Sequence, residues 1–158
     1  MKVVIFGNSG SGKSTFAKKL IADHNLKHLD LDTIAWQKTS PPKRESIEVS
    51  EQKILDFTIK NPAWVIEGCY GDLLEIAVEK CDEIHFLNLD IETCKMHCRQ
   101  RPWEPHKYES KDHQDKNLDM LLDWVSNYHA RNDEFSLRAH RKIFDSFTGK
   151  KTEFRAPI

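Results

Sequence analysis

The chain has 158 residues, the usual length of one compact domain, and its 24 basic and 25 acidic side chains give a net charge of -1. A chain without a global positive field does not hold nucleic acid through phosphate contacts alone, which argues against a nucleic-acid partner. There is no C-x-x-C pair among the four cysteines, no signal segment and no apolar stretch long enough to span a membrane. These features predict a single-domain cytoplasmic protein without a membrane partner.

Short apolar runs alternate with helical periodicity along the chain. Strands are expected at residues 2–6, 26–31, 64–66, 84–89 and 152–154. Helices are expected at 13–23, 47–59, 73–78, 91–101, 118–125 and 137–147, and the polar stretch 102–116, which contains prolines, is expected to be a loop. This alternation favours βαβ units, and therefore a three-layer α/β/α fold whose parallel sheet binds ligands at the carboxyl ends of its strands.

The residues from Gly7 to Ser14 match the phosphate-loop pattern G-x-x-x-x-G-K-[ST] between an expected strand and an expected helix. Its backbone N–H groups and the helix N-terminus are expected to bind phosphate oxygens. Lys13 is expected to contact the β- and γ-phosphates, and the hydroxyl of Ser14 to coordinate magnesium. The predicted cofactors are therefore ATP and Mg²⁺. The residues predicted to bind them are Gly7, Ser9, Gly10, Ser11, Gly12, Lys13, Ser14 and Thr15.

Other classes of nucleotide-binding protein fit less well. Signalling GTPases need D-x-x-G and N-K-x-D, and transporter-type ATPases need paired acids after a strand and a glycine-rich signature, none of which occurs here. The dinucleotide motif would need a third glycine where Thr15 stands. The compact kinases remain.

Four segments together resemble the small P-loop kinases, which include nucleoside monophosphate, shikimate and gluconate kinases. They are the phosphate loop, Leu29-Asp-Leu-Asp32, Trp64-Val-Ile-Glu-Gly68 and Cys98-Arg-Gln-Arg101. Within this group the chain is most similar to adenylate-kinase-like proteins labelled DNA topology modulation proteins. The resemblance implies a five-stranded parallel sheet in the order 2-3-1-4-5, a lid at about 102–116 and a substrate-binding insert at about 33–62.

The resemblance also implies roles for two acids and two arginines. Asp30 and Asp32 resemble a D-x-D pair, in which the first acid lies near the magnesium shell and the second near the acceptor hydroxyl. The alternative for Asp32 is a solvated turn in which it caps a short helix. Arg99 and Arg101 resemble lid-entrance arginines that neutralise the transferred phosphoryl group, although one of them can equally be a solvated helix end.

The substrate side is less defined. Glu67 and Gly68 occupy a strand end where relatives keep a substrate loop, and Glu67 suits substrate, metal-bound water or a structural ion pair. Trp36 suits either core packing or stacking on a planar acceptor. One of Arg131, Arg138 and Arg141 is expected to bind substrate or phosphate, and Arg131 is preferred because it follows a clear helix into a break. The glycine-rich and G-[FY]-P-R elements of shikimate and adenylate kinases are absent, so neither shikimate nor AMP is supported as acceptor.

Two functions fit these residues. The first is ATP- and Mg²⁺-dependent phosphoryl transfer to a small-molecule acceptor, with catalysis by Lys13, Asp30, Asp32, Arg99 and Arg101. The second is a regulatory nucleotide-binding ATPase that acts on a protein or nucleic-acid partner. Acceptor-dependent release of ADP distinguishes them.

Overall fold

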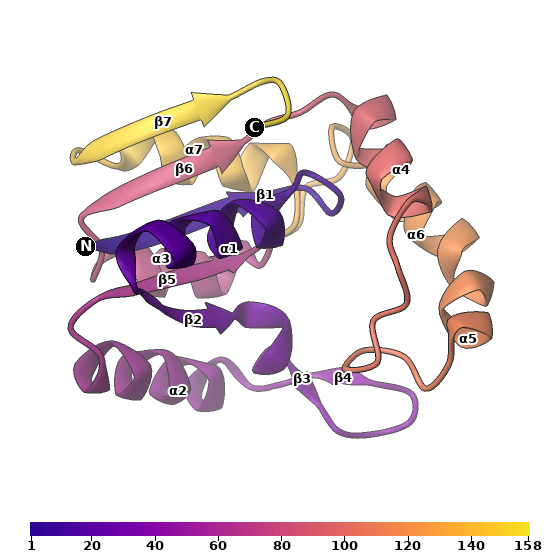
Figure 1. Cartoon of the computed structure of the whole chain (residues 1–158), viewed down its shortest axis with the longest axis horizontal. Coiled ribbons are helices and arrows are strands. Elements are labelled where there is room, and N and C mark those ends of the chain that lie inside the picture. Colours follow the sequence, from indigo (N-terminus) through magenta and orange to yellow (C-terminus); the bar gives the residue numbers. More distant parts are fainter.

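The computed structural model describes residues 1–158 and has a five-stranded parallel sheet with helices packed on both faces (Figure 1). The strand order is β2-β5-β1-β6-β7, and every neighbouring pair is parallel. The strands are β1 Lys2–Gly7, β2 Lys27–Asp30, β5 Trp64–Gly68, β6 Glu83–Leu87 and β7 Lys150–Phe154. When only the strands of this sheet are counted along the chain, the order is 2-3-1-4-5. The predicted fold class and sheet topology are therefore confirmed.

The central strand β1 is apolar from Val3 to Phe6 because both of its faces are buried. Val3 and Ile5 belong to one core with helices α1 Lys13–His24, α4 Ile91–Arg99 and α6 Leu118–Ser126. Val4 and Phe6 belong to a second core on the other face, with α2 Ile47–Lys60, α3 Gly71–Val78 and α7 Leu137–Ser146. A central strand of a parallel sheet therefore reads as a continuous apolar run rather than an alternating one.

The region expected as the substrate insert contains a short β-hairpin in addition to a helix. After β2 the chain makes a 3-10 turn, Leu31–Thr33, and then a short antiparallel hairpin of β3 Trp36–Gln37 and β4 Lys43–Arg44 before α2. The sequence analysis did not predict this hairpin, because two-residue strands carry no measurable alternation.

The expected loop at 102–116 is wrong over its last six residues, where α5 Lys111–Lys116 is helical. Ser110 caps this helix by accepting the N–H of His113, and the ion pairs Lys111–Asp115 and Lys116–Asp112 span single turns. A helix that is polar on all sides has no apolar period to detect, so its caps and i, i+4 pairs are its only signal.

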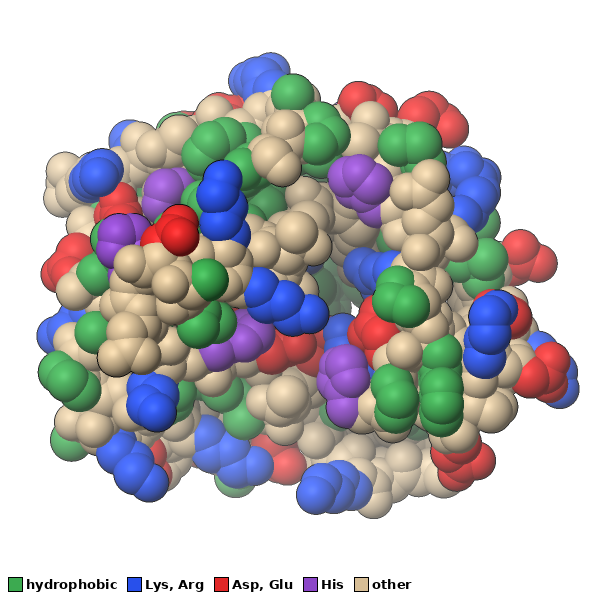
Figure 2. All heavy atoms as spheres, in the orientation of Figure 1, with side chains coloured by type: hydrophobic (Ala, Val, Ile, Leu, Met, Phe, Trp, Pro, Cys, Tyr) green, Lys and Arg blue, Asp and Glu red, His purple; other side chains and the backbone are tan.

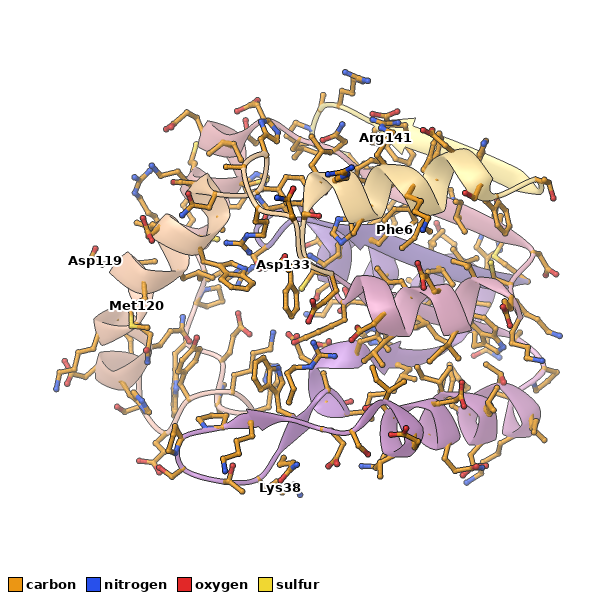
Figure 3. The ribbon with its side chains drawn as sticks, turned by 180° about the vertical axis from the view of Figure 1, so that it is seen from behind. Phe6, Lys38, Asp119, Met120, Asp133 and Arg141 are labelled. Carbon is orange, nitrogen blue, oxygen red and sulfur yellow. The ribbon has the colours of Figure 1, made fainter.

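The last helix and the last strand close one edge of the sheet. Figure 3 shows Arg141 on α7 beside β7, and Phe6 of the central strand beneath the same helix. Helices α4, α5 and α6 lie beyond the carboxyl ends of the strands (Figure 1). None of the helices has the length and apolarity needed to cross a bilayer.

Candidate active site

A cleft of about 620 Å³ opens at the carboxyl ends of the strands. Its walls are the phosphate loop after β1, the ends of β2 and β5, and the segment after α4 that is expected to act as a lid. Figure 2 shows a hollow between the body of the molecule and this segment, with charged and histidine side chains around it. The strand ends thus bring together most of the residues that the sequence analysis singled out.

The phosphate loop has the backbone geometry of an anion cradle. Gly10 and Gly12 adopt φ angles of 81° and 94°, and a Cβ atom on Gly10 would lie 2.2 Å from the carbonyl oxygen of Cys94. Helix α1 begins after this turn without a side-chain cap and without an acid in its first turn, so its N-terminal N–H groups remain available to an anion. The Ser11 hydroxyl is also buried without a hydrogen-bond partner.

Two side chains hold the loop in place. The Lys13 ammonium donates to the carbonyl of Asn8 at 2.8 Å, so it curls over its own loop. From α4, Nδ1 of His97 donates to the carbonyl of Gly10 at 2.7 Å. Triphosphate oxygens in the cradle would offer Lys13 charged acceptors in place of a neutral carbonyl, and charge-assisted hydrogen bonds are the stronger kind.

Glu67 is buried at the end of β5 and accepts a hydrogen bond from the Ser14 hydroxyl at 3.0 Å. Burial and, after it, the negative charge of Asp30 raise the pKa of Glu67 to about 7. Glu67 forms no ion pair, so the salt bridge considered for it does not exist in this structure. Its carboxyl group instead lines the cleft directly behind the phosphate loop.

Asp30 ends β2, and its Oδ1 accepts the backbone N–H of Asp32 at 2.9 Å. Asp30 is therefore the cap of the 3-10 turn, and the interpretation of Asp32 as a helix cap is wrong. The chain leaves the extended conformation at this point, so strand alternation does not carry both carboxylates to one side. Both nevertheless line the cleft, because the tight turn brings Asp32 back toward it.

Asp32 is the centre of a hydrogen-bonded network that spans the cleft. One of its oxygens accepts from the Tyr70 hydroxyl and the other from the Lys107 ammonium at 2.8 Å. Burial alone would raise the pKa of Asp32, but the positive charge and hydrogen bond of Lys107 outweigh it and lower this pKa. Trp36 does not line the cleft; its Nε1 donates to the Tyr70 hydroxyl at 2.8 Å.

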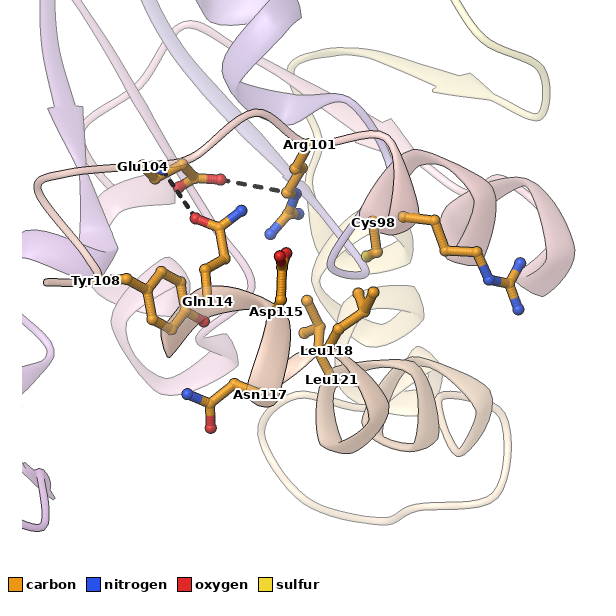
Figure 4. A pocket seen from close by; sticks show the side chains of 10 residues that line it. Cys98, Arg101, Glu104, Tyr108, Gln114, Asp115, Asn117, Leu118 and Leu121 are labelled. Atoms are coloured by element: carbon orange, nitrogen blue, oxygen red, sulfur yellow. Dashed lines mark hydrogen bonds and ion pairs between the residues drawn. The ribbon is translucent and has the colours of Figure 1, made fainter. Parts of the chain in front are cut away.

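The predicted arginines are divided by the fold. Arg101 lines the cleft and lies 3.9 Å from Glu104. Arg99 does not line the cleft but a small cavity of about 30 Å³ beneath the lid segment. Figure 4 shows this cavity, which Arg101 also lines. Arg131 does not reach the cleft, because its guanidinium stacks at 3.6 Å on Trp124 and donates to the carbonyl of the same residue.

Three residues of the cleft region were missed by the sequence analysis: Tyr70, His97 and Lys107. Tyr70 follows the strand end by two residues and His97 lies on the helix of the expected lid-entrance arginines, so both stand near predicted residues without belonging to a motif. Lys107 is one of several lysines in a polar segment, and nothing in its neighbours marks it.

The oxygen donors around Ser14 fit magnesium in kind. The Ser14 hydroxyl and the carboxylates of Asp30 and Glu67 all line the cleft, and hard cations prefer such ligands. No group of three or more His, Cys, Asp or Glu side chains forms a protein-only metal cage. Magnesium usually combines one or two protein groups with substrate phosphates and water, which agrees with this sparse set.

Comparison with known proteins adds little to this description. No family model matches the chain, and no curated protein matches it. The crystal structure of a shikimate kinase from Bacteroides thetaiotaomicron is similar, with a TM-score of 0.49, 16% sequence identity, and coverage of 79% of this chain and 77% of that chain. Since that TM-score is below 0.5, the fold assignment rests on the strand order and the phosphate loop, which define a P-loop α/β fold.

Proposed function

We propose that this protein is an ATP- and magnesium-dependent kinase that transfers the γ-phosphoryl group to a small-molecule acceptor. The observation that carries the proposal is a complete phosphate loop that shares one cleft with the carboxylates of Asp30 and Asp32. Phosphoryl transfer asks a protein for positioning and charge neutralisation more than for covalent chemistry. A cleft of about 620 Å³ also lies within the usual size of sites that hold a nucleotide-sized ligand.

In the proposed reaction, a bond forms between the acceptor oxygen and the γ-phosphorus while the bond from the γ-phosphorus to the bridging oxygen of ADP breaks. The hydroxyl proton passes to Asp32 or Asp30 and then to solvent. Lys13, Arg101 and the N-terminus of α1 neutralise the charge of the phosphates, and Asp32 or Asp30 orients the acceptor. Magnesium held by Ser14 and the water shell near Asp30 would supply further charge neutralisation.

A second candidate is a regulatory ATPase whose lid motion signals to a partner. The ion pair of Lys107 with Asp32 favours it, because this contact occupies the carboxylate that a kinase would use to orient an acceptor. The resemblance to proteins labelled DNA topology modulation proteins points to the same class of function. Such a protein would hydrolyse ATP slowly without any added acceptor.

Release of ADP from MgATP, measured with and without a panel of acceptors, tests the proposal. Release that depends on an acceptor supports a kinase, whereas release that is the same without acceptor supports the ATPase. Lys13→Ala should abolish either activity without unfolding the chain, because it removes the charge expected at the β- and γ-phosphates from a partly exposed loop. Lys53→Ala, an exposed lysine on α2, is the matched control and should retain full activity.

A further inference from the structure

The acceptor side of the cleft is the part lined by Asp30, Asp32, Gly68, Cys69 and Lys107; the other lysines and the arginine of the cleft belong to α1 (Lys13, Lys18 and Lys19) or directly follow α4 (Arg101). Lys107 is its only lysine or arginine, and the ammonium of Lys107 is already shared between two carboxylates. Burial also lowers the pKa of the neighbouring His28, which disfavours its charged form. Anionic acceptors are normally held by unpaired arginines or lysines. The acceptor side of the cleft has no unpaired arginine or lysine to bind an anionic acceptor.

Arg44, which contacts the Tyr70 ring, is fully engaged outside the cleft. Its guanidinium donates to Asp72 and Glu134, each at 3.0 Å, and its Nε donates to the carbonyl of Ala35 at 3.2 Å. It also stacks on the Tyr70 ring at 5.0 Å and is not among the residues that line the cleft. Releasing Arg44 toward a ligand would leave two carboxylates unpaired.

Lys107 itself identifies a seat for an ammonium group. Its Nζ lies 2.8 Å from Asp32 and 3.2 Å from Glu104, and only 27% of its side chain is exposed. The Tyr70 hydroxyl holds the other oxygen of Asp32, which fixes the orientation of the carboxylate. This ammonium site therefore consists of the partly buried carboxylate of Asp32 in a fixed orientation, and the cation that now occupies it, Lys107, belongs to the lid segment outside the core.

Pairing of charges discriminates between classes of acceptor. An anionic acceptor that drew Lys107 away would leave Asp32 without its cation, and Glu104 would keep only the more distant Arg101, at 3.9 Å. An acceptor that brought its own ammonium group to Asp32 would let Lys107 remain on Glu104, so that every charge kept a partner. Leaving a partly buried charge without a partner is unfavourable, so the balance of charges favours the acceptor that brings its own ammonium group.

We propose that the acceptor is a small molecule carrying both a hydroxyl and an ammonium group, an amino alcohol or amino sugar, whose ammonium replaces that of Lys107 on Asp32. The inference rests on the proposed kinase function. The bonds that form and break are those of the proposed reaction: the hydroxyl oxygen takes the γ-phosphoryl group, its proton passes to Asp30 and then to solvent, ADP leaves, and the ammonium stays protonated as a binding group only.

A charge-sorted acceptor screen tests this. The small-molecule extract of the source cells is separated by ion exchange at pH 7 into cationic, neutral and anionic fractions, and each fraction is added to the protein with MgATP. The cationic fraction should raise ADP release at least about tenfold above the other two. Stimulation by the neutral or the anionic fraction instead overturns the inference but leaves the kinase proposal standing. ADP release that no fraction stimulates contradicts the kinase proposal, and the inference falls with it.

Variants of the seat give a second readout. Lys107→Met removes the internal competitor, so it should lower severalfold the amount of the cationic fraction that gives half-maximal ADP release; an increase in that amount would contradict the proposal. Asp32→Asn should abolish the preference for the cationic over the neutral fraction. Lys111→Met, whose ammonium pairs only with Asp115 on the exposed face of α5, is the matched control and should change neither value.

Discussion

Asp30 combines a structural and a chemical role in one side chain. Its Oδ1 caps the 3-10 turn through the N–H of Asp32, and no hydrogen bond engages its other oxygen. An asparagine can keep the cap, because its Oδ1 accepts the same hydrogen bond, while the negative charge is lost. The two roles are therefore separable by choice of substitution.

Asp30→Asn should lower magnesium-dependent turnover at least about tenfold, on the order of 1.4 kcal/mol, with the urea midpoint unchanged. Asp30→Ala should in addition lower the free energy of unfolding by about 1 kcal/mol, because the cap is lost. Turnover and urea unfolding are measured on both variants. If Asp30→Asn keeps full turnover, Asp30 is a cap only.

His140 is buried as a neutral imidazole between two partners. Its Nε2 donates to the carbonyl of Cys69 at 2.8 Å, and its Nδ1 accepts from the Tyr128 hydroxyl at 2.6 Å. Desolvation is the largest influence and lowers the pKa of His140 to about 4. Through Cys69, this contact supports the turn that follows Glu67 at the end of β5.

The unfolded chain, in which this imidazole has an ordinary pKa of 6.5, binds its proton at higher pH than the native state does. The free energy of unfolding should therefore fall as pH decreases from about 6.5 to about 4, by an amount on the order of 3 kcal/mol from this group. Urea unfolding at several pH values measures the slope. His140→Gln should reduce the slope over this range, and an unchanged slope would assign it to other groups, such as His28 and His85, whose pKa values burial also lowers.

At the scale of elements, the side-chain amide of Gln114 holds the segment after α4 in place through two hydrogen bonds to its backbone. Oε1 of Gln114 accepts the N–H of Glu104 at 2.8 Å, and Nε2 donates to the carbonyl of Pro102 at 3.0 Å. Figure 4 shows Gln114 of α5 pointing at Glu104, beside Arg101. Helix α5 therefore serves as a support for the segment that carries Lys107 across the cleft.

Limited proteolysis should cleave this segment, residues 102–110, more slowly when magnesium and a nonhydrolysable ATP analogue are bound, because the lid closes over the phosphates. Gln114→Ala should accelerate cleavage in the free protein severalfold. Gln52→Ala, whose amide bonds only to Asp56 on the exposed face of α2, is the control. Equal rates with and without the analogue would count against a lid.

At the scale of the whole molecule, the edge strand β7 is tied to α7 by Arg141 and Glu153. The two side chains form two hydrogen bonds, of 2.9 and 2.8 Å, and the guanidinium stacks on Phe86. The Arg141 hydrogen bond is the main reason that the pKa of Glu153 is lowered to about 2. This pair links the sheet edge to the helix that also carries His140.

Glu153→Gln should lower the free energy of unfolding at pH 7 by about 1 kcal/mol, an amount that allows for the partial exposure of the pair. Since the carboxylate has a lower pKa in the native state, its stabilisation is present above about pH 4.5 and is lost as pH falls toward about 2. The difference from the wild-type protein should shrink over that range. Glu51→Gln, an exposed acid on α2, should show no such difference at any pH.

The sequence by itself determined the features that depend on neighbouring residues. The phosphate loop was predictable because its cradle is built from consecutive backbone groups, and the central strands because burial on both faces requires unbroken apolar runs. The strand order followed from the resemblance to small P-loop kinases and not from periodicity. Helix α5 and the β3–β4 hairpin could not be predicted from the sequence, because neither has a periodic pattern of apolar residues.

Only the tertiary structure decided how distant side chains pair. It buries Glu67 against Ser14, seats Lys107 on Asp32, and keeps Arg131 on Trp124, outside the cleft. Each outcome depends on where a turn places a charge and on how much water that place excludes. A charged side chain pairs with the opposite charge that the fold brings close to it. The distance between two side chains far apart in the sequence cannot be predicted from the residues next to either of them.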